Sequence, residues 1–228
     1  MEPNTYTLET VLQDLADQLT LPQGFLRGLL DEDDWSFVIK AHSFVEAALT
    51  HLLVTHFGNP ALEPIFAQLQ TSNPRTGKLA FIEACDLLDK PARRFVHSLS
   101  ELRNHLVHDV SNVSFAFPTY VASMSDRQRR EFLKAFDYVY VALIDAGQIP
   151  EKYTGRSSID RIVLAKPKTA MAGGLVLLAA EVYFLNRVEE HPDVLRHLSK
   201  MLLESYRVER EWRGDDVSRW RSGDVTGE

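Results

Sequence analysis

Cysteine is nearly absent from this sequence of 228 residues, and its single thiol, Cys85, excludes a disulfide bond within one chain. A chain without a disulfide framework is typical of proteins that fold in a reducing compartment. The N-terminal residues Met1–Thr5 also lack the basic start and the apolar stretch of a secretory signal peptide. Together these two absences predict a cytoplasmic protein.

The sequence also lacks an uninterrupted apolar run long enough to cross a membrane. Its most apolar window, residues 170–185, contains Glu181 and is shorter than the roughly 20 apolar residues that a spanning helix needs. We therefore expect a buried helix in this window and no association with a membrane.

An excess of positive charge is missing as well. The chain has 32 acidic residues against 25 lysines and arginines, which gives a formal net charge of -7. A protein that follows a nucleic-acid backbone without sequence preference usually carries a basic surface. The charge balance therefore argues against stable non-specific DNA binding, but it is compatible with transient contact to RNA at a local site.

The sequence contains none of the common metal-binding motifs. Two pairs of potential ligands, His105 with Asp109 and Asn104 with His108, stand four residues apart. Neither pair belongs to a His-Glu-x-x-His motif or is accompanied by a cysteine pair. We therefore expect no metal site and no cofactor.

The hydrophobic periodicity of the chain is helical almost throughout. It predicts helices over residues 8–19, 22–30, 35–56, 62–70, 78–88, 91–107, 127–146, 169–190 and 192–212. Residues 110–118 instead alternate with a period of two, which predicts an extended stretch. Residues 147–167 are expected to form a looser connection.

These elements predict an all-α fold, a helical bundle with an accessory C-terminal helical pair. The expected organisation is a set of N-terminal helices, a main bundle, a C-terminal helical extension and a polar tail that is disordered. The corresponding ranges are residues 1–32, 33–147, 148–212 and 213–228.

The densest cluster of reactive side chains lies in one helical segment, Ser98–Asp109. Within seven residues it contains a guanidinium, an amide, two imidazoles and a carboxylate, on Arg103, Asn104, His105, His108 and Asp109. A permanent cation and a group that titrates near neutrality are what a phosphate-handling site needs. On an ideal helix, however, Arg103 and His108 point about 140° apart. They converge only if the helix ends near His108 or if two chains pair.

The same residues also have a structural interpretation. In that interpretation Arg103 pairs with a carboxylate such as Glu46 or Glu101, and His108 caps the end of the helix beside Asp109. Glu46 lies on an apolar helix, where a buried carboxylate needs a partner. We predict that this partner is Arg103, and the pair would either orient the arginine within a site or stabilise the bundle.

The run from Arg103 to His108 resembles the signature of the HEPN superfamily (higher eukaryote and prokaryote nucleotide-binding domains). That signature is an arginine, often followed by a polar residue, with a histidine after a short spacer. The long apolar helix over 35–56 agrees with the resemblance, which covers roughly residues 33–147. The similarity is greatest to the mannitol-operon repressor-like branch, whose motif also ends in histidine and aspartate, as His108 and Asp109 do here.

The resemblance implies a homodimeric, metal-independent endoribonuclease of a toxin or defence type, with both copies of the motif in one cleft. His108 would transfer protons at the ribose 2′-OH or the leaving oxygen, and Arg103 would hold the scissile phosphate. Asn104 would orient His108 or the phosphate. Supporting positions are assigned to Glu46, His105 and Asp109. The implied partners are an RNA substrate and an antitoxin or regulatory protein.

Five further arginines are candidate RNA contacts, although basic residues on helices also serve simply as solvated faces: Arg93, Arg94, Arg127, Arg129 and Arg130. Many members of the superfamily keep the fold as a binding or regulatory module without cleavage. The alternative function is therefore a non-catalytic regulatory or scaffolding protein that acts through protein–protein contacts.

Overall fold

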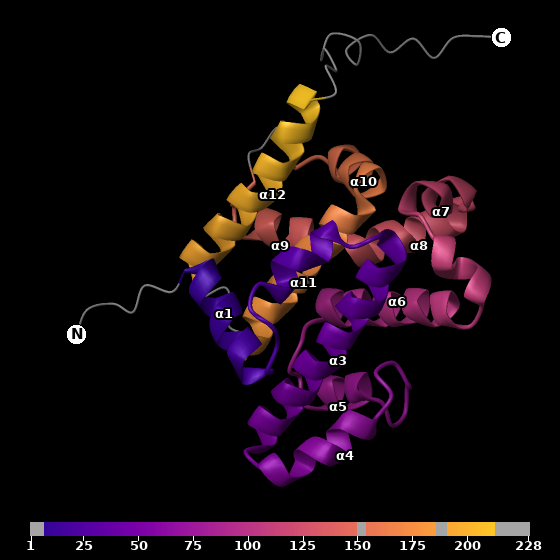
Figure 1. The fold of residues 1–228 in the computed structure, drawn as a ribbon. Helices are drawn as coiled ribbons and strands as arrows, with labels where there is room; N and C mark the ends of the chain where they lie inside the picture. The colour runs from indigo at the N-terminus through magenta and orange to yellow at the C-terminus, as the bar shows by residue number, and fades with distance from the viewer. Residues whose placement is uncertain (1–6, 150–153, 186–190, 213–228) are drawn as a thin grey trace, which may run out of the picture.

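The computed structural model describes residues 7–149, 154–185 and 191–212. All regular structure within these ranges is helical, which confirms the all-α fold class (Figure 1). The α-helices are α1 (Leu8–Gln18), α2 (Phe25–Gly28), α3 (Asp34–Phe57), α4 (Glu63–Gln68), α5 (Lys78–Ala84), α6 (Lys90–Val107), α7 (Phe117–Ser123), α8 (Asp126–Phe136), α9 (Tyr138–Asp145), α10 (Arg156–Ala165), α11 (Pro167–Tyr183) and α12 (Pro192–Trp212). Single 3-10 turns cover Leu29–Asp31, Pro60–Leu62 and Val110–Ser114. The expectations for residues 1–5 and for the tail 213–228 lie outside the described residues.

The long helix α3 forms as predicted because both of its ends carry strong local signals. The Asp33 side chain accepts a hydrogen bond from the Ser36 backbone N–H at 2.9 Å, which satisfies a free donor of the first turn. Gly58 ends the helix with a φ of 60°, a left-handed conformation that glycine adopts without steric cost. Helix α3 then packs against α4, α5, α6 and α11 and runs through the middle of the bundle.

The helix that carries the polar segment, α6, begins and ends close to its predicted limits. Asp89 caps its start by accepting the Ala92 backbone N–H at 2.7 Å. One face is apolar and fully buried against α3 and α8, and it includes Phe95, Leu99 and Leu106. The neighbouring face therefore presents the polar residues of the segment at the border with α3 and at the protein surface.

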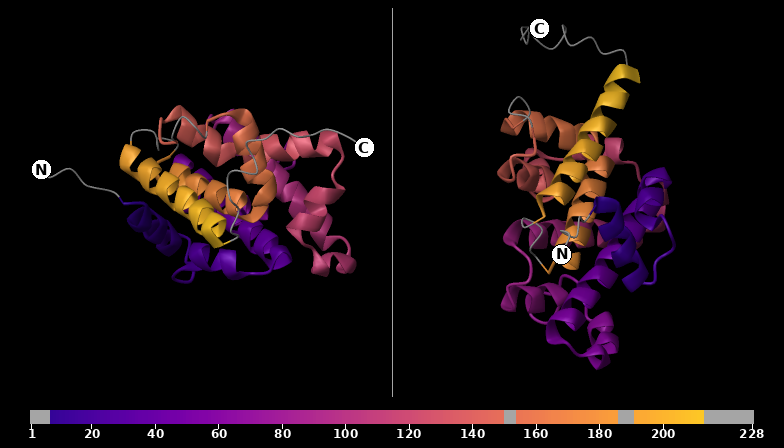
Figure 2. Two further views of the ribbon diagram at one scale, coloured as in Figure 1. Left: turned by 90° about the horizontal axis from the view of Figure 1, so that it is seen from above. Right: turned by 90° about the vertical axis from the view of Figure 1, so that its left-hand side faces the viewer.

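The two C-terminal helices, α11 and α12, differ in how deeply they are buried. Helix α11 packs against α1, α3, α9, α10 and α12 and is central, whereas α12 lies on the outside of the bundle (Figures 1 and 2). A Cβ atom on Gly174 would lie 2.5 Å from the ring of Phe95 on α6, so only glycine permits this approach. The reason for the difference is that α11 is apolar on all sides, which favours burial of its whole surface.

The extended stretch predicted for residues 110–118 is wrong. The chain forms a 3-10 turn over Val110–Ser114 and then α7. Asp109 caps the turn by accepting the Ser111 N–H at 2.8 Å, and Asp34 accepts the Phe117 N–H at 2.8 Å. The acceptor of the second bond lies 83 positions earlier in the chain. The local alternation of apolar residues therefore does not predict this bond.

The segment after residue 125 is also divided differently from the prediction. The helix expected over 127–146 is two helices, α8 and α9, which meet at Asp137. The loose connection expected over 147–167 contains α10, whose first residue, Arg156, forms ion pairs with Asp137 and Asp160. Burial raises the pKa of the Asp137 carboxyl above its ordinary value, and the bond to Arg156 opposes that rise. This pairing ties α10 to the α8–α9 junction.

Helix α3 is long and apolar enough, by length and composition alone, to cross a bilayer. Helices α10 and α11 would pass the same test as one span bent by 106°. In the structure, 61% of the most apolar window of α3 is buried within the protein. Burial of this kind is what the central helix of a bundle requires.

Candidate functional site

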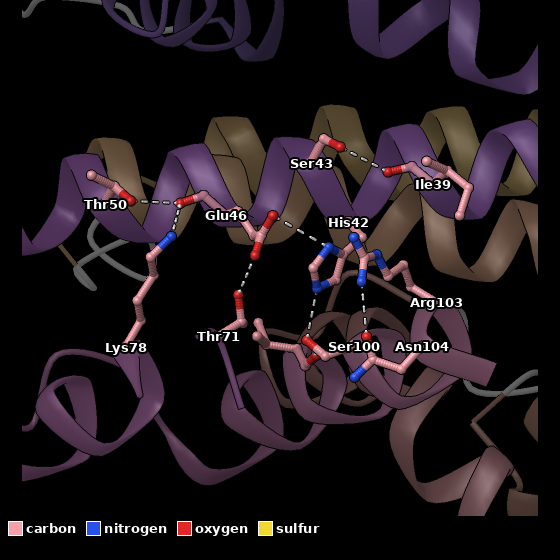
Figure 3. A network of polar contacts seen from close by, with 11 residues as sticks. Ile39, His42, Ser43, Glu46, Thr50, Thr71, Lys78, Ser100, Arg103 and Asn104 are labelled. Carbon is pink, nitrogen blue, oxygen red and sulfur yellow. Dashed lines mark hydrogen bonds and ion pairs between the residues drawn. The ribbon is translucent and has the colours of Figure 1, made fainter. Parts of the chain in front are cut away.

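Arg103 points from α6 toward α3 and lies half-buried between the two helices. Its Nη1 atom donates a hydrogen bond to Oδ1 of Asn104 at 3.0 Å, and its guanidinium lies beside the ring of His42 (Figure 3). Among the described residues, no carboxylate comes within ion-pair distance of the Arg103 guanidinium. Arg103 is therefore a cation that is oriented by an amide and is not neutralised by a neighbouring acid.

The predicted ion pair between Glu46 and Arg103 is wrong. One carboxylate oxygen of Glu46, Oε1, accepts a hydrogen bond from the Thr71 hydroxyl at 3.1 Å. The other, Oε2, lies 3.6 Å from Nδ1 of His42, one helical turn earlier on α3 (Figure 3). Glu46 takes these partners because His42 lies on the same face of α3 at i,i+4 spacing. The loop before α5 brings the Thr71 hydroxyl to the other oxygen of the same carboxylate.

His42 connects the two helices and is buried, with 4% of its surface exposed. The Ser100 hydroxyl donates to the Val96 carbonyl at 2.9 Å, so its oxygen accepts from Nε2 of His42 at 3.2 Å. Burial lowers the pKa of the His42 imidazole, the facing Glu46 carboxylate raises it, and the Arg103 charge lowers it further. His42 is thus a buried and hydrogen-bonded core histidine.

His108 lies at the opposite extreme of exposure. It is the exposed residue that ends α6, and its backbone N–H still donates to the Asn104 carbonyl at 3.3 Å. Its φ of -77° and ψ of -15° are helical, so the backbone makes no deflection that would turn the side chain toward Arg103. The two groups keep their separation of about 140° around the axis, and in the described structure no hydrogen bond joins them. One chain by itself does not form the arginine–histidine site.

The supporting residues His105 and Asp109 have separate surroundings. His105 lines a surface cavity of about 260 Å³ together with Tyr120, whose ring centre lies 6.5 Å from its own. Asp109 accepts the Ser111 N–H as a turn cap, and this bond lowers the pKa of its carboxyl. Asp109 therefore has a structural role, whereas His105 belongs to a different surface from the Arg103 guanidinium.

Two of the five candidate RNA-binding arginines are used inside the protein. Arg93 donates to the Leu88 carbonyl at 2.6 Å and to Glu83 Oε1 at 3.2 Å, which joins α6 to the segment after α5. Arg94 donates to the Lys134 carbonyl at 3.4 Å. These bonds fit the structural interpretation of the Arg93–Arg94 pair better than an interface role.

The other three arginines lie on α8. Arg127 is exposed and lines the same cavity as His105. Arg130 is exposed, and Arg129 has a buried Nε atom with no hydrogen-bond partner. Among these three arginines, Arg127 is thus the one that lines a cavity together with His105.

Four polar residues of this region were not among the predicted site residues, namely His42, Thr71, Lys78 and Ser100. The i,i+4 spacing of His42 and Glu46 on an apolar helix was a usable signal for one of them. The positions of Thr71 and Lys78 depend on how the loop before α5 folds back, which the local sequence does not indicate. In the part of the chain that is described, no three His, Cys, Asp or Glu residues are grouped so that they could hold a metal ion.

Comparison of the chain with protein-family models, with curated proteins and with solved structures gives no match. The resemblance to the HEPN superfamily therefore depends on the residues from Arg103 to Asp109 and on the long helix that precedes them.

Proposed function

We propose that this protein is a HEPN-type, metal-independent endoribonuclease that acts as a homodimer. The observation that carries the proposal is the state of Arg103, a half-buried guanidinium that is held by Asn104 and has no carboxylate within ion-pair distance in the part of the chain that the structure describes. A guanidinium in this state can accept a phosphate group through charge-assisted hydrogen bonds.

The reaction needs a proton acceptor and donor near the phosphate, and His108 is the proposed group. Its imidazole removes the proton from the ribose 2′-OH, and the 2′ oxygen then attacks the phosphorus. The bond to the 5′ oxygen breaks, the leaving oxygen takes up a proton, and a 2′,3′-cyclic phosphate remains. Arg103 stabilises the negative charge that builds on the phosphate oxygens, and Asn104 keeps the guanidinium oriented.

The divergence of Arg103 and His108 on α6 is the reason for proposing a dimer. Each site would combine Arg103 of one copy with His108 of the partner subunit, related by a two-fold axis. An antitoxin or regulatory partner would act by covering the same two groups.

The test is cleavage of structured RNA by the purified protein in the presence of EDTA. Activity is expected to survive chelation and to disappear in Arg103→Ala and in His108→Ala. Mixing the two inactive variants is expected to restore about a quarter of the wild-type activity, because half of the dimers are mixed and each has one complete site. Cleavage that is equal in wild type and both variants would contradict the proposal.

A second candidate, a non-catalytic regulatory or scaffolding protein, is favoured by the charge distribution. The formal net charge is -7, and Arg93 and Arg94 are engaged in bonds within the protein. A wild-type protein that is dimeric but leaves RNA intact at every pH tested would support this candidate over the nuclease.

A further inference from the structure

A cavity of about 400 Å³ lies between the end of α1 and helices α3, α4 and α5. Its volume is within the range of about 300–1,000 Å³ that is typical of small-molecule sites. Its polar lining comes from four segments and consists of Gln18, Thr20, Glu46, Thr50, His51, Glu63 and Lys78. The proposed nuclease reaction uses none of these residues, although Glu46 also faces His42.

Lys78 is the cation of the cavity, and only 2% of its surface is exposed. Its Nζ atom donates to the backbone carbonyl of Glu46 at 3.2 Å (Figure 3). In the described residues no carboxylate lies within ion-pair distance of this ammonium. Burial lowers the pKa of Lys78, and the negative charge of the Glu46 carboxylate opposes that decrease. An anionic ligand group would supply a counter-ion in direct contact, which the more distant Glu46 carboxylate does not provide.

Two carboxylates line the same cavity. Glu46 contributes the carboxylate that also contacts Thr71 and His42, and Glu63 is exposed at the start of α4. A simple anion at Lys78 would be repelled by these acids, and a simple cation would be repelled by Lys78. The lining therefore suits a ligand that carries both charges.

The backbone at the edge of the cavity is strained. Thr20 has a φ of 55°, a left-handed conformation that β-branched residues rarely adopt. It follows α1 at the position where glycine usually ends a helix, and the Leu21 N–H closes the turn on the Ala16 carbonyl at 2.8 Å. A threonine in this place keeps a hydroxyl at the cavity that glycine would remove, and strain of this kind is common at ligand-binding sites.

We propose that this cavity binds a small zwitterion, an α-amino acid. Its carboxylate pairs with the Lys78 ammonium, and its ammonium group lies toward the carboxylates of Glu46 and Glu63. This ligand site is additional to the proposed nuclease function and does not depend on it.

The test is isothermal titration calorimetry of the full-length protein with each of the twenty common α-amino acids. Propionate and ethylamine, which carry only one of the two charges, serve as half-molecule controls. At least one amino acid is expected to bind with a Kd of about 1 mM or lower, and the controls are expected to bind much more weakly. Binding by none of the twenty, or equal binding by a control, would overturn the proposal.

Substitutions locate the site. Lys78→Met retains the buried aliphatic chain without its charge and is expected to weaken binding at least about 10-fold. Because Lys78 is buried, Lys78→Met can fail to fold. The second variant, Glu63→Gln, changes an exposed residue and is expected to weaken binding by about 2- to 5-fold. Asp145→Asn, an exposed acid on α9 with the same charge change, is the matched control. Equal affinity in Glu63→Gln, Asp145→Asn and wild type would contradict this placement of the ligand. No RNA is present, so the result is independent of the nuclease test.

Discussion

The two halves of the polar segment on α6 lie in opposite environments. Ser100 and Arg103 face α3, where they meet His42 in a network of buried and half-buried contacts. His108 lies at the end of the same helix in full contact with solvent. In the first region Ser100 is hydrogen-bonded to His42 and Arg103 to Asn104, whereas in the second the His108 side chain is exposed to solvent. The turn of one helix thus separates residues that are close in the sequence into a buried group around His42 and a free group at His108.

The largest expected effect concerns the free group. His108→Ala is expected to lower RNA cleavage by roughly 10²- to 10⁴-fold, the usual contribution of a proton-transferring side chain. Its free energy of unfolding should stay within about 0.5 kcal/mol of wild type, since the side chain is exposed. Cleavage rates and urea unfolding measured on the same preparation check both expectations. A large loss of stability would remove the distinction between the two regions.

The next effect concerns the buried group. His42→Ala is expected to lower the free energy of unfolding by about 2–4 kcal/mol, because it opens a cavity and leaves Glu46 without its partner on α3. Chemical denaturation gives the value. His56→Ala, near the exposed end of α3, is the matched control and should cost less than about 0.5 kcal/mol. Equal effects in the two variants would show that the His42 network contributes nothing to stability.

A smaller effect is expected at the boundary between the regions. Asp109→Ala removes the cap of the Val110–Ser114 turn and should cost about 1 kcal/mol. Thermal unfolding of this variant beside Asp145→Ala, which removes an exposed acid without a capping bond, isolates the contribution of the cap. If Asp109→Ala instead leaves stability unchanged and abolishes RNA cleavage, Asp109 belongs to the free group.

The smallest effect concerns pH. Burial lowers the pKa of His42 in the folded protein below its ordinary value of 6.5, so the unfolded chain binds more protons in the window just below pH 6.5. The contribution of His42 to the free energy of unfolding is therefore fully present above pH 6.5 and is lost as the pH falls below that value. Urea unfolding at pH 7.5 and pH 5.5 should show a decrease for wild type and a smaller one for His42→Gln. An identical pH dependence in both proteins would assign the loss to other groups.

The sequence was sufficient to predict the helices that have local start and stop signals. It was insufficient where contacts with residues distant in the chain determine the local structure. Helices α1, α3, α6 and α12 lie close to their predicted ranges. The turn over Val110–Ser114 and the helix α7 were missed because Asp34 supplies a bond to Phe117 from far along the chain. The presence of α10 depends in the same way on the pairing of Arg156 with Asp137.

The candidate site was predicted less completely than the fold. The divergence of Arg103 and His108 follows from helix geometry and was foreseen. The partners of Glu46 were not predicted. The i,i+4 spacing of His42 indicated one of them, whereas the other, Thr71, depends on the fold of the loop before α5. Sequence spacing gives directions around one helix, but it does not say which neighbouring helix each direction meets.

The contact between Gly174 and Phe95 has a consequence for how the chain can be divided. The Phe95 ring is fully buried on α6, and the Val139 side chain lies 3.2 Å from where a Cβ on Gly173 would be. Helix α11 therefore covers part of the hydrophobic core of residues 33–147. Removal of the residues after 147 would expose the Phe95 and Val139 side chains, so residues 33–147 are not expected to fold stably as an independent domain.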